Sequence, residues 1–199
     1  MLRSAMTLAV AAAVAMPVSG RTETLAYPRM LPLASYLSPN RQAEIDFARS
    51  AAPPAISRNA TVLVLTAHGY EAAAKGTNGF TCLVERGWMS PFDSPKFWNP
   101  KIRGPICYNP AASRTVLLYT IRRTEMVLGG VTKAQMLARV ESAVSAGKVP
   151  APEPGSMSYM ISKTQFLDPD AGAWLSHLMI YTPKADAAHN GASWGANVR

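Results

Sequence analysis

The chain contains 199 residues, of which 48% are hydrophobic and 16% are charged. That composition excludes wholesale disorder and suits one domain with a sizeable core. Lysine and arginine number 20 against 12 aspartates and glutamates, which gives a formal net charge of +8. A net positive charge favours binding to anionic partners. Alternatively, it only keeps the protein soluble. No five basic residues follow one another, so nucleic acid is not expected as a partner.

The first twenty residues have the three parts of a secretory signal peptide. Arg3 gives a basic start, and residues 5–18 are almost entirely apolar. Residues 18–20 have small side chains, as a signal-peptidase cleavage site requires. The apolar run is too short for a permanent membrane-spanning helix. We therefore expect residues 1–20 to be a signal peptide and the mature chain to begin near Arg21. The protein would be periplasmic or secreted, without a transmembrane segment after cleavage.

Turn residues and apolar periodicity divide the rest of the chain into short elements. An irregular lead-in is expected over 21–37 and an irregular tail over 184–199. In chain order, the expected elements between them are a helix over 39–51; strands over 61–66, 70–75 and 80–86; a long loop over 87–108; helices over 110–128 and 133–146; and strands over 156–162 and 177–182.

Local signals fix three of these boundaries. Ser38 is the expected N-cap of the first helix, because its hydroxyl can accept from a free backbone N–H. Asn78-Gly79 predicts a tight hairpin between the strands on either side of it, since both residues tolerate a positive φ angle. Thr132 and Gln135 have the spacing of a capping box at the start of the last helix.

These elements predict a single α+β domain over residues 21–199. Strands that are not separated by regular helical crossovers favour an antiparallel or mixed sheet, here of about four to five strands, with the two main helices on one face. Alternation within the strand over 80–86 separates two sets of side chains. The two sets are Phe80, Cys82 and Val84 on one face, and Thr81, Leu83 and Glu85 on the other.

The two cysteines, Cys82 and Cys107, have 24 residues between them. An even number of cysteines in an exported protein indicates a disulfide first. Closing a loop of that size would stabilise the fold by roughly 3.5 kcal/mol through chain entropy. Two free buried thiols and a redox pair are the alternatives, although the Cys-x-x-Cys spacing of redox pairs is absent.

The loop between the cysteines is rich in basic and aromatic side chains, with Asp93 as its one acid. Basic groups attract anions, and aromatic faces stack on sugars and other flat groups. We therefore expect residues 88–108 to bind an anionic small molecule, an envelope polymer or a carbohydrate-like ligand. The candidate ligand-binding residues are Arg86, Trp88, Phe97, Trp98, Lys101, Arg103 and Tyr108. The alternative is that the aromatic side chains form a small core beneath the loop.

No catalytic or cofactor motif is recognised. The three histidines, His68, His177 and His189, lack metal-ligand spacing, and no phosphate-binding or dinucleotide fingerprint occurs. No metal or cofactor is therefore expected. The sequence favours a non-enzymatic binding module. The alternatives are a small exported hydrolase or metal-dependent enzyme with His177 and His68 near a cleft, and a structural component of the cell envelope.

Several segments together resemble an uncharacterised family of exported bacterial proteins. The resemblance covers most of the mature chain and implies a bacterial, exported origin. It brings no activity, ligand or catalytic residue. The segments that carry it are residues 76–84 (GTNGFTCLV), 97–101 (FWNPK), 105–110 (PICYNP), 150–155 (PAPEPG) and 194–197 (WGAN).

Overall fold

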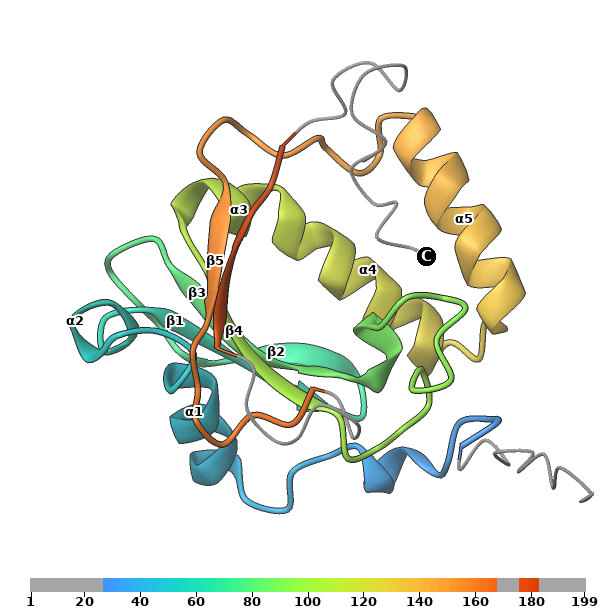
Figure 1. Cartoon of the computed structure of the whole chain (residues 1–199), viewed down its shortest axis with the longest axis horizontal. Helices are drawn as coiled ribbons and strands as arrows, with labels where there is room; N and C mark the ends of the chain where they lie inside the picture. The colour runs from blue at the N-terminus through green and yellow to red at the C-terminus, as the bar shows by residue number, and fades with distance from the viewer. Residues whose placement is uncertain (1–26, 168–175, 183–199) are drawn as a thin grey trace, which may run out of the picture.

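A six-stranded mixed sheet runs through the molecule with helices on both of its faces (Figure 1). This computed structural model describes residues 27–167 and 176–182. It confirms the α+β class and the single domain. The signal peptide, a turn expected at 168–172 and the tail over 184–199 lie outside the described residues. Within the described ranges, no helix has the length and apolar character needed to cross a bilayer.

The elements follow the predicted order closely. In chain order they are η1 (Leu33–Ser35), α1 (Arg41–Arg49), α2 (Pro54–Ser57), β1 (Thr61–Thr66), β2 (Gly69–Ala74), β3 (Thr81–Arg86), η2 (Gly87–Met89), β4 (Arg103–Tyr108), α3 (Pro110–Arg114), α4 (Val116–Leu128), α5 (Lys133–Ser145), β5 (Met157–Met160) and β6 (His177–Ile180). The predicted capping box at Thr132 and Gln135 is present. Asn40, rather than Ser38, caps α1, because its side chain accepts from the N–H of Ala43.

The sheet has the strand order β2-β1-β3-β4-β5-β6. The β1–β3 pair is parallel and the other four pairs are antiparallel. The prediction of four to five strands was too low, because β4 lies within the segment 87–108 that was expected to be a loop. Pro105 is tolerated in this strand because it occupies a narrow pair opposite Val84, in which the backbone nitrogen does not bond across the pair.

The predicted hairpin at Asn78-Gly79 was wrong. The turn forms, with Gly79 at a φ angle of 77°, but β2 and β3 do not pair. Instead, the side-chain amide of Asn78 donates to the carbonyl of Ile56, and Thr61 N–H bonds the carbonyl of Phe80. These bonds direct β3 to lie parallel to β1, since the turn is anchored to the segment before β1 rather than to β2.

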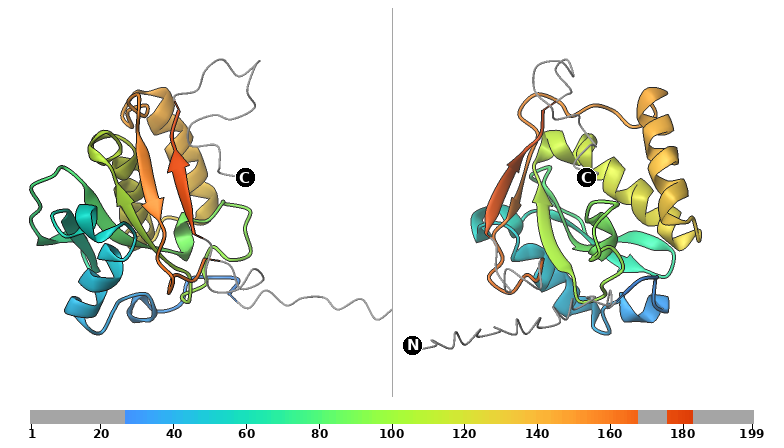
Figure 2. Two further views of the ribbon diagram at one scale, coloured as in Figure 1. Left: turned by 60° about the vertical axis from the view of Figure 1, so that its left-hand side comes forward. Right: turned by 45° about the vertical axis from the view of Figure 1, so that its right-hand side comes forward.

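The helices cover the two faces of the sheet unequally. The two main helices, α4 and α5, lie on the side toward which the twisted sheet is concave, and α4 runs across it (Figures 1 and 2). The shorter α1 packs against the opposite face, over β1, β3 and β4. The helix expected over 110–128 is interrupted at Thr115, whose φ and ψ angles of −125° and −74° are not helical.

Alternation along β3 gives each face its own core, as predicted. Cys82 and Val84 belong to the core under α1, whereas Leu83 belongs to the core under α4. Cys82 lies directly opposite Cys107 on β4, and the two form a disulfide with their Cα atoms 4.0 Å apart. The predicted bridge is therefore confirmed. Glu85 follows Leu83 on the α4 side, where the rest of the face is mainly apolar.

Candidate functional site

The site is built around Glu85, at the end of β3 on the concave side of the sheet. Its partner across the β3–β4 ladder is Gly104. A Cβ atom at Gly104 would lie 2.7 Å from side-chain atoms of Leu167 and Met160. Those two side chains therefore fill the space beside Glu85, and the carboxylate sits in a mostly apolar neighbourhood.

Two hydroxyl groups hold one oxygen of the carboxylate. The Tyr108 hydroxyl on β4 donates to Oε1 of Glu85 at 2.7 Å, and the Thr120 hydroxyl on α4 donates at 3.2 Å. The two hydroxyl oxygens are themselves 2.8 Å apart. Among the described residues, no group donates to Oε2 of Glu85. The carboxylate is thus fixed in position while one oxygen stays available.

Burial raises the pKa of the Glu85 carboxyl above its ordinary value. The bonds from Tyr108 and Thr120, and the charges of Arg123 and His177, act in the opposite direction but do not cancel the effect. Burial and the adjacent carboxylate in turn raise the pKa of Tyr108 well above its ordinary value. Tyr108 therefore stays protonated and donates, while Glu85 is the group that titrates.

β6 forms the wall next to this carboxylate. The register pairs Met160 with His177 and Ser158 with Met179, so these residues share the face toward α4. The hydroxyls of Ser158 and Tyr181 are 2.8 Å apart. Burial raises the pKa of Tyr181, and the Glu85 charge adds to the rise.

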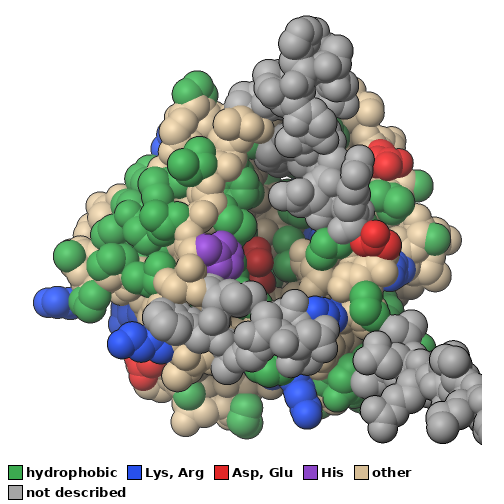
Figure 3. All heavy atoms as spheres, in the orientation of Figure 1, with side chains coloured by type: hydrophobic (Ala, Val, Ile, Leu, Met, Phe, Trp, Pro, Cys, Tyr) green, Lys and Arg blue, Asp and Glu red, His purple; other side chains and the backbone are tan. Residues whose placement is uncertain are grey.

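This side of the molecule is hollowed. Figure 3 shows a recessed acidic side chain beside a histidine, at the edge of a hollow between the sheet and the helices. Glu85 and His177 are both half-buried, neither enclosed nor fully exposed. A carboxylate, an imidazole and the half-buried hydroxyl of Tyr181 are therefore accessible on this side, whereas the hydroxyls of Tyr108, Thr120 and Ser158 are buried behind them.

Arg123 on α4 is buried, and it is close enough to Glu85 for the two charges to interact. Its guanidinium donates to the hydroxyl of Tyr119 at 2.8 Å and to the carbonyl of Ser90, and it lies 4.0 Å from the ring centre of Phe92 and 5.1 Å from that of Phe97. Burial lowers the pKa of Arg123, although the nearby Glu85 carboxylate opposes this. Arg123 thus lies between Glu85 and the loop that joins the two cysteines.

That loop is mostly folded inward. The side chains of Arg86, Trp88, Phe97 and Tyr108 are at most 1% exposed. Phe92, Phe97 and Trp88 pack with Val127 of α4 and with Met136 and Val140 of α5. Trp98 and Arg103 are half-buried, and Lys101 is exposed. The seven residues predicted to form one binding surface are therefore distributed over a core, an ion-pair network and the surface.

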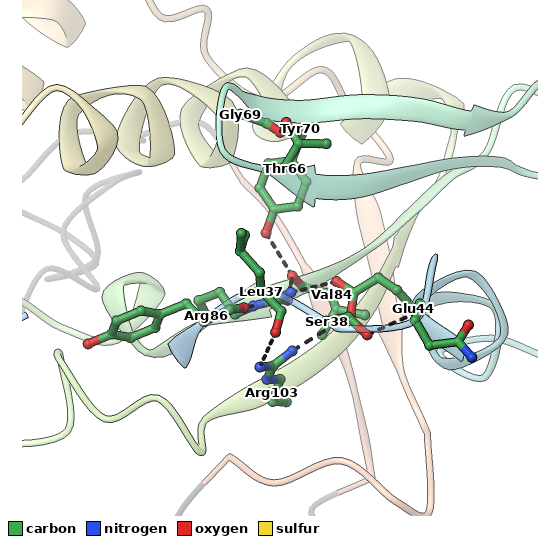
Figure 4. Close-up of polar contacts among 11 residues, drawn as sticks. Leu37, Ser38, Glu44, Thr66, Gly69, Tyr70, Val84, Arg86 and Arg103 are labelled. Atoms are coloured by element: carbon green, nitrogen blue, oxygen red, sulfur yellow. Dashed lines mark hydrogen bonds and ion pairs between the residues drawn. The ribbon is translucent and has the colours of Figure 1, made fainter. Parts of the chain in front are cut away.

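Arg86 and Arg103 belong to the ion-pair network, which lies on the α1 side of the sheet (Figure 4). Arg86 contacts Glu44 at 2.6 Å and donates to the backbone carbonyls of Tyr36 and Val84. Arg103 lies 3.7 Å from the other oxygen of Glu44 and donates to the carbonyl of Leu37. The network ties the lead-in and α1 to the sheet, which is a structural role.

The two histidines of the enzyme hypothesis are not brought together. His68 is exposed in the turn between β1 and β2, at one end of the sheet, whereas His177 is on β6 at the other. Within the described part of the chain, no three His, Cys, Asp or Glu residues are arranged to hold a metal ion. His177 is close enough to Glu85 for its charge to act on that carboxyl group.

Sequence analysis missed Glu85, Thr120, Ser158 and Tyr181 as site residues. One usable signal was present for Glu85: it is an acid on the strand face that also carries Leu83, where apolar packing is expected. Thr120 and Ser158 carried no such signal, because short hydroxyl side chains are common on buried faces. We find no family model, curated protein or solved structure that matches this chain.

Proposed function

We propose that the protein binds a small, uncharged, hydroxyl-bearing molecule of the carbohydrate kind in the hollow at Glu85. The observation that carries the proposal is the carboxylate itself: Oε1 is fixed by two hydroxyls, while Oε2 accepts no hydrogen bond from the described residues. A recessed carboxylate repels anions and accepts strongly from hydroxyl donors. The half-buried hydroxyl of Tyr181, which is braced by the buried hydroxyl of Ser158, supplies a further partner at the wall.

Binding through the loop 88–108 stays a prediction, and we favour the hollow over it for a physical reason. The aromatic faces that would stack on a ligand are buried against α4 and α5. Exposing them would forfeit core packing, which costs roughly 3–5 kcal/mol for one large aromatic side chain. A ligand in the hollow requires no such rearrangement.

The test is calorimetric titration with neutral sugars. Glucose, N-acetylglucosamine and their oligomers are titrated into the wild type, with glucuronate as the charged match. We expect a neutral sugar to bind and Glu85→Ala to weaken it about tenfold or more, as expected for loss of a charge-assisted bond. Trp98→Ala should leave the affinity unchanged. Binding of glucuronate alone, no binding of any sugar, or an unaffected Glu85→Ala variant would contradict the proposal.

A hydrolase is the second candidate, favoured by one observation. Glu85 and His177 are two titratable groups on one face, close enough for the histidine to lower the carboxyl pKa. A carboxyl group with a raised pKa is suited to general acid–base catalysis. Hydrolysis of nitrophenyl glycosides by the wild type, lost in Glu85→Gln, would favour this candidate over binding alone. Equal rates in the two proteins would exclude it for these substrates.

We also propose that the protein is exported to the periplasm or the medium. Two observations support this: the signal-peptide pattern over 1–20 and the disulfide between Cys82 and Cys107. Intact-mass analysis of the protein from its native host tests the proposal. A chain that begins near Arg21 and is two mass units lighter than the dithiol is expected. A chain that retains Met1–Gly20 in the cytoplasm would contradict it.

A further inference from the structure

We infer that a second site, on the opposite side of the sheet from Glu85, binds a tetrahedral oxyanion such as phosphate, either free or as a phosphomonoester. It is a surface cavity of about 540 Å³ between the end of α1, the start of α2 and the segment that follows β5. Six of its lining residues carry the argument: Arg49, Ser50, Ser57, Ser162, Lys163 and Thr164.

The charge of the cavity has one sign. Arg49 and Lys163 are both positive, and no aspartate or glutamate lines the cavity. Among the described residues, neither Arg49 nor Lys163 takes part in an ion pair. Two positive charges that lack an ion-pair partner and line one cavity attract an anion, and they disfavour a neutral or cationic ligand.

Arg49 supplies the observation that points to a missing partner. Its Nε–H is buried and has no acceptor among the residues that the structure describes. Buried donors are nearly always hydrogen-bonded, so an orphaned one needs an explanation. Arg49 also lies in the last turn of α1, where a cation offsets the helix dipole. That role does not provide the Nε–H with an acceptor, whereas an oxyanion bound to the guanidinium would do so once the side chain turns toward the cavity.

The hydroxyl groups of Ser57, Ser162 and Thr164 add donors to the two cations. The Ser50 hydroxyl already donates to the carbonyl of Phe47 at 2.6 Å and lies 2.7 Å from the Ser162 hydroxyl, and the Ser162 and Thr164 hydroxyls are 3.3 Å apart. Ser57 is buried at the same cavity, and its hydroxyl has no hydrogen bond among the described residues. Hydroxyls and a guanidinium together match the many acceptor positions of a tetrahedral oxyanion better than those of a planar carboxylate.

The site is held by contacts that link distant segments. The N–H of Ile161 bonds the carbonyl of Ala51 at 3.1 Å, which fixes the segment after β5 against the end of α1. Arg49 and Lys163 are therefore positioned by the fold rather than by adjacency in sequence. Because Lys163 is exposed and Arg49 is half-buried, binding should weaken as salt concentration rises.

The test is an NMR titration of the isotope-labelled wild type with inorganic phosphate, at fixed ionic strength maintained with sodium chloride. We expect saturable shifts of the backbone amides of Ser50, Lys163 and Thr164. Lys163→Gln and Arg49→Gln should each raise the dissociation constant about tenfold, typical of losing a charge-assisted bond. Arg139→Gln and Lys148→Gln remove the same charges from exposed positions on and just after α5, and should leave it unchanged.

Glycerol 3-phosphate distinguishes the source of the oxyanion. Tighter binding than inorganic phosphate would assign the site to a phosphomonoester, and equal or weaker binding would assign it to the free ion. Glu85→Ala should not affect either titration, so this proposal stands apart from the sugar site. Shifts that do not saturate, or that are equal in Lys163→Gln and the wild type, would overturn it. Lys163 is exposed, so this variant remains informative if Arg49→Gln fails to fold.

Discussion

Two carboxylates on opposite faces of one sheet have different environments. Glu44, on the α1 side, is 3% exposed and is flanked by the guanidinium groups of Arg86 and Arg103 at 2.6 and 3.7 Å. Glu85, on the α4 side, is half-buried, and the described residues that donate to it are the hydroxyls of Tyr108 and Thr120. The first carboxylate is ion-paired, whereas the second takes part in no ion pair among the described residues and feels Arg123 and His177 only at longer range.

The difference separates structure from function. Breaking a buried ion pair leaves an uncompensated charge, so Glu44 and Arg86 hold their elements in one arrangement. A recessed carboxylate without a cationic partner costs stability when it ionises, and such costs concentrate at functional sites. The ion pairs on the α1 face therefore stabilise the fold, whereas the α4 face carries a carboxylate that can interact with a ligand.

Arg86→Met should have the largest effect on stability. It removes the ion pair to Glu44 and the bonds to the carbonyls of Tyr36 and Val84. We expect the free energy of unfolding to fall by about 3–5 kcal/mol, the range for breaking a buried ion pair. Urea unfolding of the oxidised protein measures it.

An exposed ion pair provides the matched control. Arg122 lies 2.9 Å from Glu125 on α4, and both side chains are about half or more exposed. Arg122→Met should change the free energy of unfolding by less than about 0.5 kcal/mol. If the two variants lost a similar free energy of unfolding, the buried ion-pair network under α1 would not stabilise the fold more than an exposed ion pair does.

Removal of the disulfide should have the next largest effect. Cys82→Ala with Cys107→Ala opens a cross-link between residues 25 positions apart, and we expect a loss of about 2–4 kcal/mol. Both sulfurs lie in the core on the α1 side. The titration of Glu85, followed by carboxyl NMR, should therefore stay as in the wild type. A large change in that titration would show that the two faces are not independent.

Glu85→Gln should stabilise the protein at neutral and alkaline pH, but not at acidic pH. Burial raises the carboxyl pKa in the folded state, so the unfolded chain loses this proton first as pH rises. Wild-type stability therefore falls from the unfolded pKa up to the folded pKa and then levels off. Glutamine does not ionise, so the variant should gain on the order of 1 kcal/mol at pH 8 and nothing at pH 3.

Glutamine still accepts from Tyr108 and Thr120 through its amide oxygen, so the comparison isolates the charge. Glu141→Gln, at an exposed position on α5, is the control and should show no such pH-dependent gain. Thermal unfolding of the three proteins from pH 3 to pH 8 makes the measurement. A destabilised Glu85→Gln variant at pH 8 would mean that the ionised carboxylate has a partner which balances its charge.

Most of the fold follows from local patterns in the sequence. A short apolar run of β-branched residues identified β1, alternation fitted β3 and β5, and the capping box located the start of α5. The pairing of strands was harder to infer. The turn at Asn78-Gly79 has the hairpin signature, but its partners at Ile56 and Thr61 come from earlier in the chain. Such long-range bonds are not encoded in a local pattern.

The site was less predictable than the fold, and its residues show why. Aromatic and basic residues drew attention to the segment between the cysteines, yet Trp88 and Phe97 are needed to fill the core between α4 and α5. Glu85 gained importance only when β4, α4 and β6 brought Tyr108, Thr120 and His177 around it. Composition shows which groups are present, whereas tertiary packing decides which of them stay unpaired.

Tyr108→Phe should have a small effect on stability and the clearest effect on Glu85. The tyrosine hydroxyl donates to Oε1 at 2.7 Å and lowers the carboxyl pKa, so its removal should raise that pKa further. Loss of one buried hydrogen bond should cost about 1 kcal/mol. Tyr159→Phe, on the opposite face beside Phe80, should leave the titration unchanged. A Glu85 pKa that fell, or did not move, in Tyr108→Phe would mean that this hydroxyl does not stabilise the carboxylate. The distinction between Glu44, held by cations, and Glu85, held by hydroxyls, would then lose its basis.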